Sequence, residues 1–167
     1  MDFTLTDEQE ALRSSVRRWA TREVAPGAPE RDRDSRWDPR VWESLAAQGL
    51  AGLPIPEQLG GGGGSITDCC VANEAIGEGG RDGGLTLSLG AHWVIGSVPI
   101  WLHGTQEQQQ EWLPGLCDGT YIGSWASTEP EAGSDAGSIR TTAVRDGSDW
   151  VLNGTKIFIT NGSIASL

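Results

Sequence analysis

The segment from Thr128 to Asp135 carries residue types well suited to chemistry. It reads Thr-Glu-Pro-Glu-Ala-Gly-Ser-Asp and lies between two runs of strand-like composition. It combines a hydroxyl at a strand end and a rigid proline with a Gly-Ser pair, where backbone amides can approach an anion closely. Such a loop could hold a pyrophosphate or a polarised heterocycle. Thr-Glu-Pro and Gly-Ser-Asp are also ordinary turn sequences, so an acidic turn remains the alternative interpretation.

A second candidate is the run Phe158-Ile159-Thr160-Asn161 further along the chain. In a strand, Phe158 and Thr160 share one face because side chains alternate with a period of two. Phe158 could then pack against a flat ring while Thr160 donates a hydrogen bond to the edge of that ring. Core packing with a threonine at the strand end is the alternative interpretation.

The glycine run from Gly60 to Gly64 precedes a predicted helix, which invites a phosphate-binding interpretation. No Gly-Lys-Ser/Thr ending follows it, and Pro54 and Pro56 stand where a buried parallel strand should lead in. We therefore interpret the run as a flexible turn.

The histidines and cysteines are predicted to be structural. His92 and His103 have no carboxylate or nucleophile in their sequence context, so neither is expected to be catalytic. Cys69, Cys70 and Cys117 match neither a disulfide framework nor the spacing of a zinc site. We expect three buried thiols in a reducing compartment and no metal.

Before residue 120 the chain is predicted to be helical. Capping boxes, an Asp-Pro pair, capping hydroxyls and apolar residues at helical spacing mark the starts. The predicted helices are Thr6 to before Pro26, Asp38 to Gly49, Ser65 or Thr67 to about Gly79, Gly83 to about Leu102, and Thr105 to Leu116. The fourth is apolar around most of its circumference, so it is expected in the centre of a bundle.

After Gly119 the composition changes to short strand-like runs. Turns of Asp146-Gly147-Ser148 and Asn153-Gly154 separate some of them. The predicted strands are Tyr121–Ser127, Ile139–Arg145, Asp149–Leu152 and Lys156–Thr160. Helices followed by strands give an α+β fold class with a domain boundary near residue 120. Because two or three hairpin strands rarely form a stable sheet alone, we expect the chain to be truncated.

Composition excludes some classes of function. A net charge of −11 argues against a nucleic-acid partner, which requires a clustered basic face. The first residues contain no basic run before an apolar one, so no signal peptide is predicted. No apolar stretch is expected to approach the ~20 residues of a membrane span. We expect a soluble, cytoplasmic protein without membrane contact.

Motifs along the whole chain, in the same order, resemble those of the acyl-CoA dehydrogenase family. The flavin-contacting segments of that family carry T-E-P-x-A-G-S-D and, later, W-I-T-N. The matching residues are Leu5-Thr6-Asp7-Glu8-Gln9 with Leu12-Arg13, Pro56-Glu57 with Gly60-Gly61, Gly104-Thr105 with Glu107-Gln108, Trp112-Leu113-Pro114 with Gly119, Trp125 to Asp135, and Lys156 to Asn161.

The resemblance implies an architecture and a set of ligands. Residues 1–120 would form the family's N-terminal α-helical bundle, and residues 121–167 the first strands of its β-barrel-like middle domain, without the C-terminal helical domain. The cofactor would be FAD and the substrate an acyl-CoA or acyl-carrier thioester of lipid metabolism. Electron-transfer flavoprotein is the suggested acceptor, and the full-length family suggests a homo-oligomer.

The resemblance also assigns site residues. The implied cofactor-binding residues are Trp125, Ala126, Ser127, Thr128, Gly133, Ser134, Phe158, Ile159 and Thr160. Trp125 to Thr128 would lie along the flavin, Gly133 and Ser134 would approach the phosphates, and Ser134 would also lie near the acyl-CoA. Phe158 would flank the isoalloxazine and Thr160 would lie near flavin N5.

Two residues depart from the family pattern within those segments. Phe158 replaces the commoner tryptophan, which keeps a ring but loses the indole donor. Glu131 stands where a small residue is frequent, and its carboxylate would repel a diphosphate unless it faces solvent.

The family's reaction removes a proton from the acyl α-carbon and passes hydride from the β-carbon to flavin N5. Its glutamate base lies in the C-terminal helical domain, so no catalytic residue is assigned here, and Glu129 and Glu131 are placed in the cofactor loop. We expect the isolated chain to be inactive. Besides an enzyme fragment, two hypotheses stay open: a relative acting on acyl-carrier-protein thioesters or as a flavin oxidase or monooxygenase, and a non-catalytic subunit that needs a partner.

Overall fold

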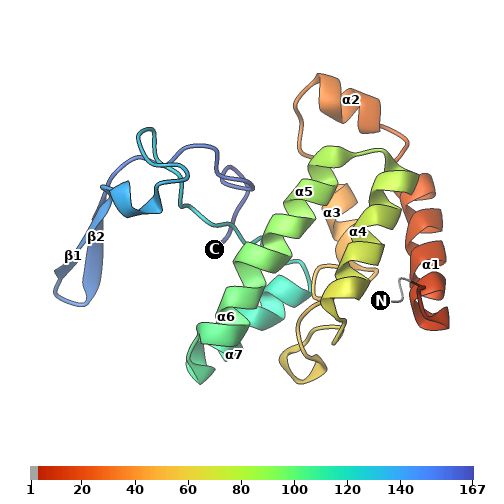
Figure 1. Ribbon diagram of the computed structural model, residues 1–167, viewed down its shortest axis with the longest axis horizontal. Coiled ribbons are helices and arrows are strands. Elements are labelled where there is room, and N and C mark those ends of the chain that lie inside the picture. The colour runs from red at the N-terminus through yellow and green to blue at the C-terminus, as the bar shows by residue number, and fades with distance from the viewer. Residues whose placement is uncertain (1–3) are drawn as a thin grey trace.

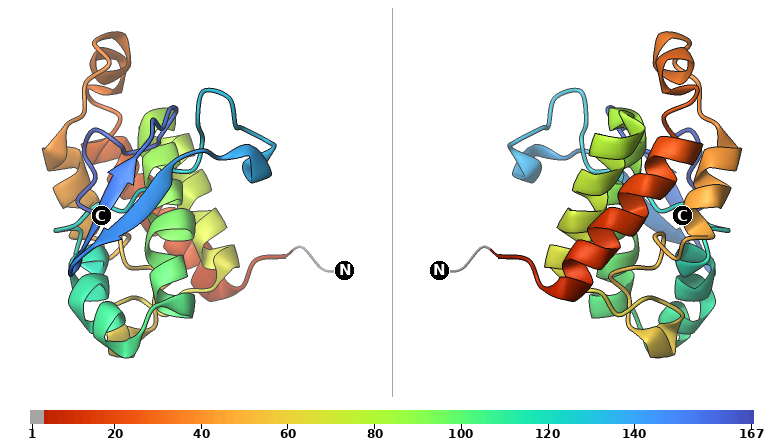
Figure 2. Two further views of the ribbon diagram at one scale, coloured as in Figure 1. Left: turned by 90° about the vertical axis from the view of Figure 1, so that its left-hand side faces the viewer. Right: turned by 90° about the vertical axis from the view of Figure 1, so that its right-hand side faces the viewer.

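The computed structural model describes residues 4–167, which form a group of helices followed by a projecting β-hairpin (Figures 1 and 2). The elements are α1 Asp7–Glu23, α2 Ala28–Arg33, α3 Pro39–Ala46, η1 Glu57–Leu59, α4 Ile66–Gly80, α5 Gly83–Ala91, η2 His92–Ser97, α6 Val98–His103, α7 Gln106–Cys117, η3 Ala136–Ser138, β1 Thr142–Asp146 and β2 Asp149–Asn153. The predicted α+β fold class, a helical part followed by antiparallel strands, is confirmed.

The capping boxes predicted at the starts of α1 and α7 are present. At α1 the Gln9 N–H donates to Thr6 Oγ1 at 3.3 Å, and the Thr6 N–H donates to Gln9 Oε1 at 3.1 Å. Thr105 and Gln108 repeat this exchange at α7 with distances of 3.3 and 2.9 Å. Reciprocal bonds of this kind satisfy N–H groups that have no partner within the helix. At α4 the capping residue is Ser65, whereas Thr67 lies inside the helix.

Helix α2 is not among the predicted helices, the first of which ends before Pro26. Pro29 lies in the first turn of α2, where a missing N–H costs nothing. The Arg31 guanidinium fastens this short helix: it donates to the Asp82 carboxylate at 2.8 Å and to the Val24 carbonyl at 2.7 Å. Both charged side chains are largely buried, so the pair is shielded from solvent.

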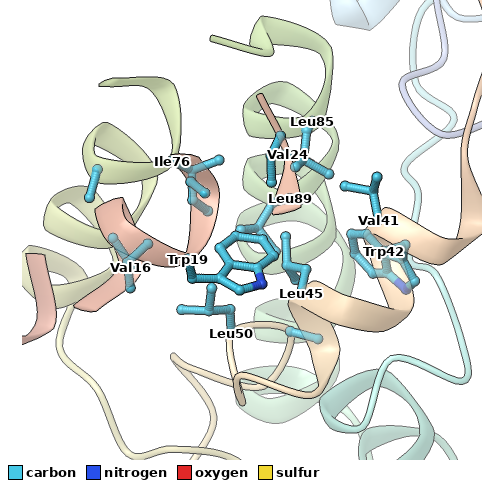
Figure 3. Close-up of a cluster of buried hydrophobic side chains, with 14 of the residues drawn as sticks. Val16, Trp19, Val24, Val41, Trp42, Leu45, Leu50, Ile76, Leu85 and Leu89 are labelled. Atoms are coloured by element: carbon cyan, nitrogen blue, oxygen red, sulfur yellow. The ribbon is translucent and has the colours of Figure 1, made fainter. Parts of the chain in front are cut away.

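The main core lies between α1, α3, α4 and α5. Figure 3 shows its apolar side chains, with Trp19 from α1 and Leu45 from α3 packed against Leu89 of α5. Helix α1 lies close against α4 because Gly79 has no side chain at the contact. A Cβ on Gly79 would lie 2.5 Å from the Arg17 carbonyl oxygen.

Residues Gly83 to His103 form one continuous rod of α5, η2 and α6, as predicted, but the rod is not central. Leu89 and Trp93 are buried, whereas Leu87 and Val94 are exposed. The prediction that this helix lies in the centre of a bundle is therefore wrong, since only one side is covered by the described chain.

The same rod, Gly83–His103, corrects the prediction that no stretch is long and apolar enough to span a membrane. Its mean hydropathy reaches 1.4 over an 18-residue window, and it meets the criteria of length and composition. A core helix meets the same criteria, and 44% of this window is buried against the rest of the protein. Length and composition alone are therefore weak evidence for a membrane span.

The glycine run packs as a tight turn. The N–H groups of Gly61, Gly62, Gly63 and Gly64 all donate to backbone carbonyls between Gly52 and Pro56. A Cβ on Gly61 would lie only 1.9 Å from the Ile55 carbonyl oxygen. Because these N–H groups already have partners, they are not available to a phosphate, and the turn interpretation holds.

The hairpin is shorter than the predicted strands. β1 and β2 pair antiparallel around Gly147-Ser148, with Asp146 opposite Asp149. The predicted Ile139–Arg145 strand begins three residues later as β1, and Asp149–Leu152 agrees with β2. Tyr121–Ser127 and Lys156–Thr160 form no strand in the described chain. Their residue types favour strands, but a strand requires a neighbour that supplies a ladder of hydrogen bonds.

The three cysteines are free, as expected, but they are not all buried. Cys69 and Cys117 are buried, and burial raises the pKa of each thiol to about 11. Cys70 is exposed, so the prediction of three buried thiols is wrong for this residue. Because Cys70 follows Cys69 on α4, its side chain is turned by one helical step away from the buried face.

Candidate functional site

The two sequence segments singled out for chemistry lie together. The Ile157 N–H donates to the Thr128 carbonyl oxygen at 2.9 Å. The Ser124 hydroxyl donates to the Thr160 carbonyl oxygen at 2.7 Å. These two contacts join residues 124–128 to residues 157–160, as the predicted site requires, although neither segment is a strand.

The aromatic residues of both segments are open to solvent. Trp125 is 55% exposed and Phe158 is 89% exposed. Large apolar side chains usually become buried, so two exposed rings on adjacent segments are informative. They present two surfaces against which a flat ring could pack.

The prediction that Phe158 and Thr160 share one face of a strand is wrong. Phe158 has a φ of 54°, in the left-handed region, and residues 156–160 are not extended as a strand. A bulky side chain rarely adopts this conformation, and such backbone strain is often found at ligand sites. Phe158 therefore remains a candidate for contact with a ring, with a different geometry.

The hydroxyl groups predicted to contact a cofactor have no partner among the described residues. In residues 4–167 the side chains of Ser127, Thr128, Ser134 and Thr160 make no hydrogen bond. Gly133 is exposed, and a Cβ there would meet no atom within 4 Å. Packing does not explain the glycine, whereas close approach of a ligand to its backbone would.

Ala126 and Ile159 complete the predicted set. Ala126 is exposed. Ile159, which lies between Phe158 and Thr160 in the sequence, is half-buried. Ser134 is exposed, so its hydroxyl is open to a ligand. Two adjacent segments with exposed rings and unpaired hydroxyls suit a heterocycle linked to a diphosphate, so the residues fit FAD.

Glu129 organises the loop from within. Its carboxylate accepts from the Arg140 N–H at 2.8 Å, from the Thr141 N–H at 2.9 Å and from Lys156 Nζ at 2.9 Å. Lys156 Nζ also donates to the Ser127 carbonyl oxygen at 2.8 Å. Glu129 thus holds the loop, the start of the hairpin and the second segment together.

The environment of Glu129 keeps the carboxylate ionised. Thr141 contributes most, followed by the Arg140 N–H and the Lys156 ammonium, and together they lower the pKa of Glu129 to about 2. A carboxylate with such a low pKa is a weak base, so Glu129 is unsuited to proton abstraction. Glu131 is exposed, so its carboxylate faces solvent as a diphosphate site requires.

The structure gives a role in the site to residues for which the sequence predicts none. Lys156 and Glu129 form the ion pair described above, and Asn161 is buried under the two segments. Ser88 and His92 reach the same region from the long helical rod. The signal that could have found the last two is a pair of polar residues four positions apart on an otherwise apolar helix.

A large cleft in the described chain borders this site. Its volume is about 1090 Å³, and it lies between α2 and the turn that joins α4 to α5. Thr160 and Asn161 line one part of it, but Trp125 and Phe158 do not. Within residues 4–167, no group of three or more His, Cys, Asp or Glu side chains could hold a metal ion.

Comparison with known proteins shows the family. Residues 6–120 match the description "Acyl-CoA dehydrogenase, N-terminal domain", and residues 124–167 match "Acyl-CoA dehydrogenase, middle domain". A probable acyl-CoA dehydrogenase of Bacillus subtilis, YngJ, is 39% identical over 165 residues, which cover 99% of this chain and 43% of YngJ.

Solved structures agree with this match. An FAD complex of PigA superposes with a TM-score of 0.91 and 36% identity, covering 99% of this chain and 43% of PigA. Butyryl-CoA dehydrogenase from Megasphaera elsdenii superposes with a TM-score of 0.90 and 35% identity, covering 99% of this chain and 44% of that enzyme.

A helical domain followed by antiparallel strands is the architecture that this chain shares with these proteins. The chain belongs to the acyl-CoA dehydrogenase family, as the sequence motifs indicate. It spans less than half the length of the relatives it matches.

Proposed function

We propose that this chain is the N-terminal, FAD-binding part of an oxidoreductase that oxidises an acyl thioester at its α,β carbon–carbon bond. The observation that carries the proposal is the pairing of residues 124–128 with residues 157–160, which brings two exposed rings and several unpaired hydroxyls together. Family membership supports the same conclusion.

The residues divide the binding of FAD between them. Trp125 and Phe158 would pack on the isoalloxazine, where apolar contact removes ring surface from water. The Thr128 and Thr160 hydroxyls would donate to polar atoms at the edge of the ring. Gly133 and Ser134 would present their backbone N–H groups to the diphosphate, with Ser134 also near the acyl thioester.

When bound, FAD would accept the hydride that leaves the substrate β-carbon. This chain would bind and orient the flavin, and its apolar rings would exclude water from one part of the site. The Glu129 carboxylate is engaged by three donors, so it would hold the loop rather than take the α-proton. We assign no catalytic base within the described residues.

The substrate class, the electron acceptor, the compartment and the assembly form part of the same proposal. The substrate would be an acyl-CoA or acyl-carrier thioester of lipid metabolism, and electron-transfer flavoprotein would be an acceptor. Free thiols at Cys69 and Cys117 are consistent with a reducing, cytoplasmic compartment. Assembly of the whole protein into a homo-oligomer is proposed on the family resemblance.

The test is flavin binding by the purified chain. The chain is mixed with FAD, passed through a gel-filtration column, and titrated while its visible absorbance is recorded. The parent chain should elute with flavin, and Phe158→Ala should weaken binding about tenfold because a stacked ring contributes about 1 kcal/mol or more. Trp150→Ala removes another exposed ring, 62% exposed on the hairpin, and should bind like the parent. A parent chain that elutes folded but colourless would refute the proposal.

The hairpin favours a second candidate, a subunit without catalysis of its own that another polypeptide completes. Val144, Trp150 and Leu152 are exposed on both faces of two strands, and two strands alone are marginally stable. A chain that binds FAD without acyl-CoA-dependent dye reduction would agree with this candidate. Dye reduction by the purified chain alone would contradict it.

A further inference from the structure

A buried polar network lies beneath the two flavin segments. Its central residue is Asn161, which is 9% exposed and has a φ of 65°. The Asn161 Nδ2 group donates to the Ser88 carbonyl oxygen at 3.0 Å and to the Gly123 carbonyl oxygen at 3.1 Å. The Ser88 hydroxyl donates to Asn161 Oδ1 at 2.5 Å. Both carbonyl oxygens can only accept, so the chemistry determines which end of the amide faces them.

The network continues through Gly123. The Gly123 N–H donates to His92 Nδ1 at 3.0 Å, and its carbonyl accepts from Asn161 as described. Gly123 lies so close to the long rod that a Cβ on Gly96 would be 3.0 Å from the Gly123 Cα. Both backbone groups of Gly123 are therefore bonded to side chains, which explains why no strand begins at this point.

The helical rod is distorted where it meets Gly123. Residues His92–Ser97 form a π-helical turn, η2, which begins one helical turn after Ser88. The Ser97 hydroxyl donates to the His92 carbonyl oxygen at 3.0 Å and to the Trp93 carbonyl oxygen at 3.3 Å. Single π turns within α-helices often mark functional positions. Here the turn presents His92 and Gly96 to the segment that leads into Trp125.

Asn161 thus touches both segments and the rod at once. It directly follows Thr160, whose carbonyl accepts from the Ser124 hydroxyl, and it bonds Gly123, which directly precedes Ser124. Removal of the Asn161 side chain would leave the Ser88 and Gly123 carbonyl oxygens without this donor in a buried place. Buried polar groups without partners are costly, so the segments would shift.

We infer that Asn161 is a positioning residue, which sets the distance and angle between the Trp125–Thr128 segment and the Phe158–Thr160 segment and thereby the affinity and electronic environment of bound flavin. This inference rests on the proposed FAD-binding function. Asn161 acts through its neighbours and does not itself touch the cofactor.

The test uses the 167-residue chain, FAD as the probe and a substitution that keeps the backbone relaxed. Glycine accepts a positive φ, so Asn161→Gly removes the side-chain bonds without adding backbone strain. We expect FAD to bind about tenfold more weakly, the equivalent of one lost hydrogen-bonding group. The visible absorption bands of the bound flavin should also shift, which a loss of stability alone would not cause.

The matched control is Asn153→Gly, at the exposed end of β2, which should leave FAD affinity and flavin bands unchanged. Circular dichroism and urea unfolding report whether each variant folds. If Asn161→Gly does not fold, Ser88→Ala decides instead, since it removes one donor to Asn161 and keeps a good helix former. For Ser88→Ala we expect about threefold weaker binding.

Parent affinity and parent flavin bands in a folded Asn161→Gly chain, or in Ser88→Ala when the first variant is unfolded, would overturn the inference alone. A parent chain that binds no FAD would overturn the proposed function together with it. The first failure is observed in a variant and the second in the parent chain, so the experiment distinguishes them.

Discussion

Mild acid should destabilise the protein through His92. This residue is fully buried, and its ring lies edge-on to Trp42 with centroids 5.1 Å apart. His92 Nδ1 accepts the Gly123 N–H, so Nε2 carries the proton of the neutral ring and donates to the Leu116 carbonyl oxygen at 3.0 Å. A second proton would have to enter at Nδ1, where it would displace the Gly123 bond.

The size of the effect follows from the pKa. Burial lowers the pKa of His92 from its usual 6.5 to about 4, although the bond to Leu116 opposes part of this change. Above pH 6.5 the ring is neutral in both the folded and the unfolded chain. As the pH falls from 6.5 toward 4, His92 binds a proton in the unfolded chain but stays neutral in the folded chain, so the free energy of unfolding decreases. This lowering of the pKa corresponds to about 3 kcal/mol in the free energy of unfolding. About 2 kcal/mol of it is lost between pH 7 and pH 5.

Urea unfolding at pH 7 and pH 5, followed by tryptophan fluorescence, measures this loss. The parent should lose about 2 kcal/mol in the free energy of unfolding between the two values. His92→Gln should be less stable at pH 7, because its bonds fit less well, but should lose little more at pH 5. His103→Gln, at the exposed end of α6, should keep the pH dependence of the parent. Equal stability of the parent at both pH values, or an unchanged loss in His92→Gln, would refute the reasoning.

Two further predictions concern the turn and the loop. Gly61→Ala should lower the free energy of unfolding by about 1–3 kcal/mol or more, because a Cβ there meets a backbone oxygen. The control in urea unfolding is Gly83→Ala, where a Cβ meets nothing within 4 Å. Equal stability of the two variants would contradict the packing argument. The Glu129 pKa of about 2 lies below its usual 4.5, so its contribution is present above pH 4.5 and is lost as the pH falls toward 2. Glu129→Gln should therefore lower the Tm at pH 7 and weaken the acid dependence below pH 4.5, since the ion pair with Lys156 is gone. Glu131→Gln, at an exposed position, should leave Tm against pH unchanged, and a parent-like profile for Glu129→Gln would count against the loop-holding role.

The helices were predictable because their signals are local. The capping box of Thr6 and Gln9 depends on residues three positions apart, and the Asp38-Pro39 start depends on neighbours. Short-range bonds of this kind form wherever the chain has these residues. Helix α2 was not predicted because Pro29 is compatible with a helix end and with a helix start. In addition, the Asp82 partner of Arg31 lies far away in the sequence.

Strands depend on partners instead, and the predictions were weaker there. The β1–β2 hairpin formed because both strands and their turn lie within a few residues of each other. Residues Tyr121–Ser127 and Lys156–Thr160 have strand-like composition, but several of their backbone groups are bonded to side chains or to single backbone groups, such as the Ile157 N–H to the Thr128 carbonyl oxygen. Composition reports that a residue suits a sheet, and it cannot report whether a neighbouring strand is present.

The candidate site combines both situations. Its proposed contact residues Trp125 and Phe158 are predicted from motif and residue type, and both rings are exposed in the structure. The residues that hold them in place were not found, because Asn161, Gly123 and His92 are far apart in the sequence and meet only through folding. Each of them also has an ordinary structural explanation when considered alone. Their proposed positioning role follows from their contacts within one buried network. The Asn161→Gly experiment therefore tests the part of the site that no local pattern in the sequence describes.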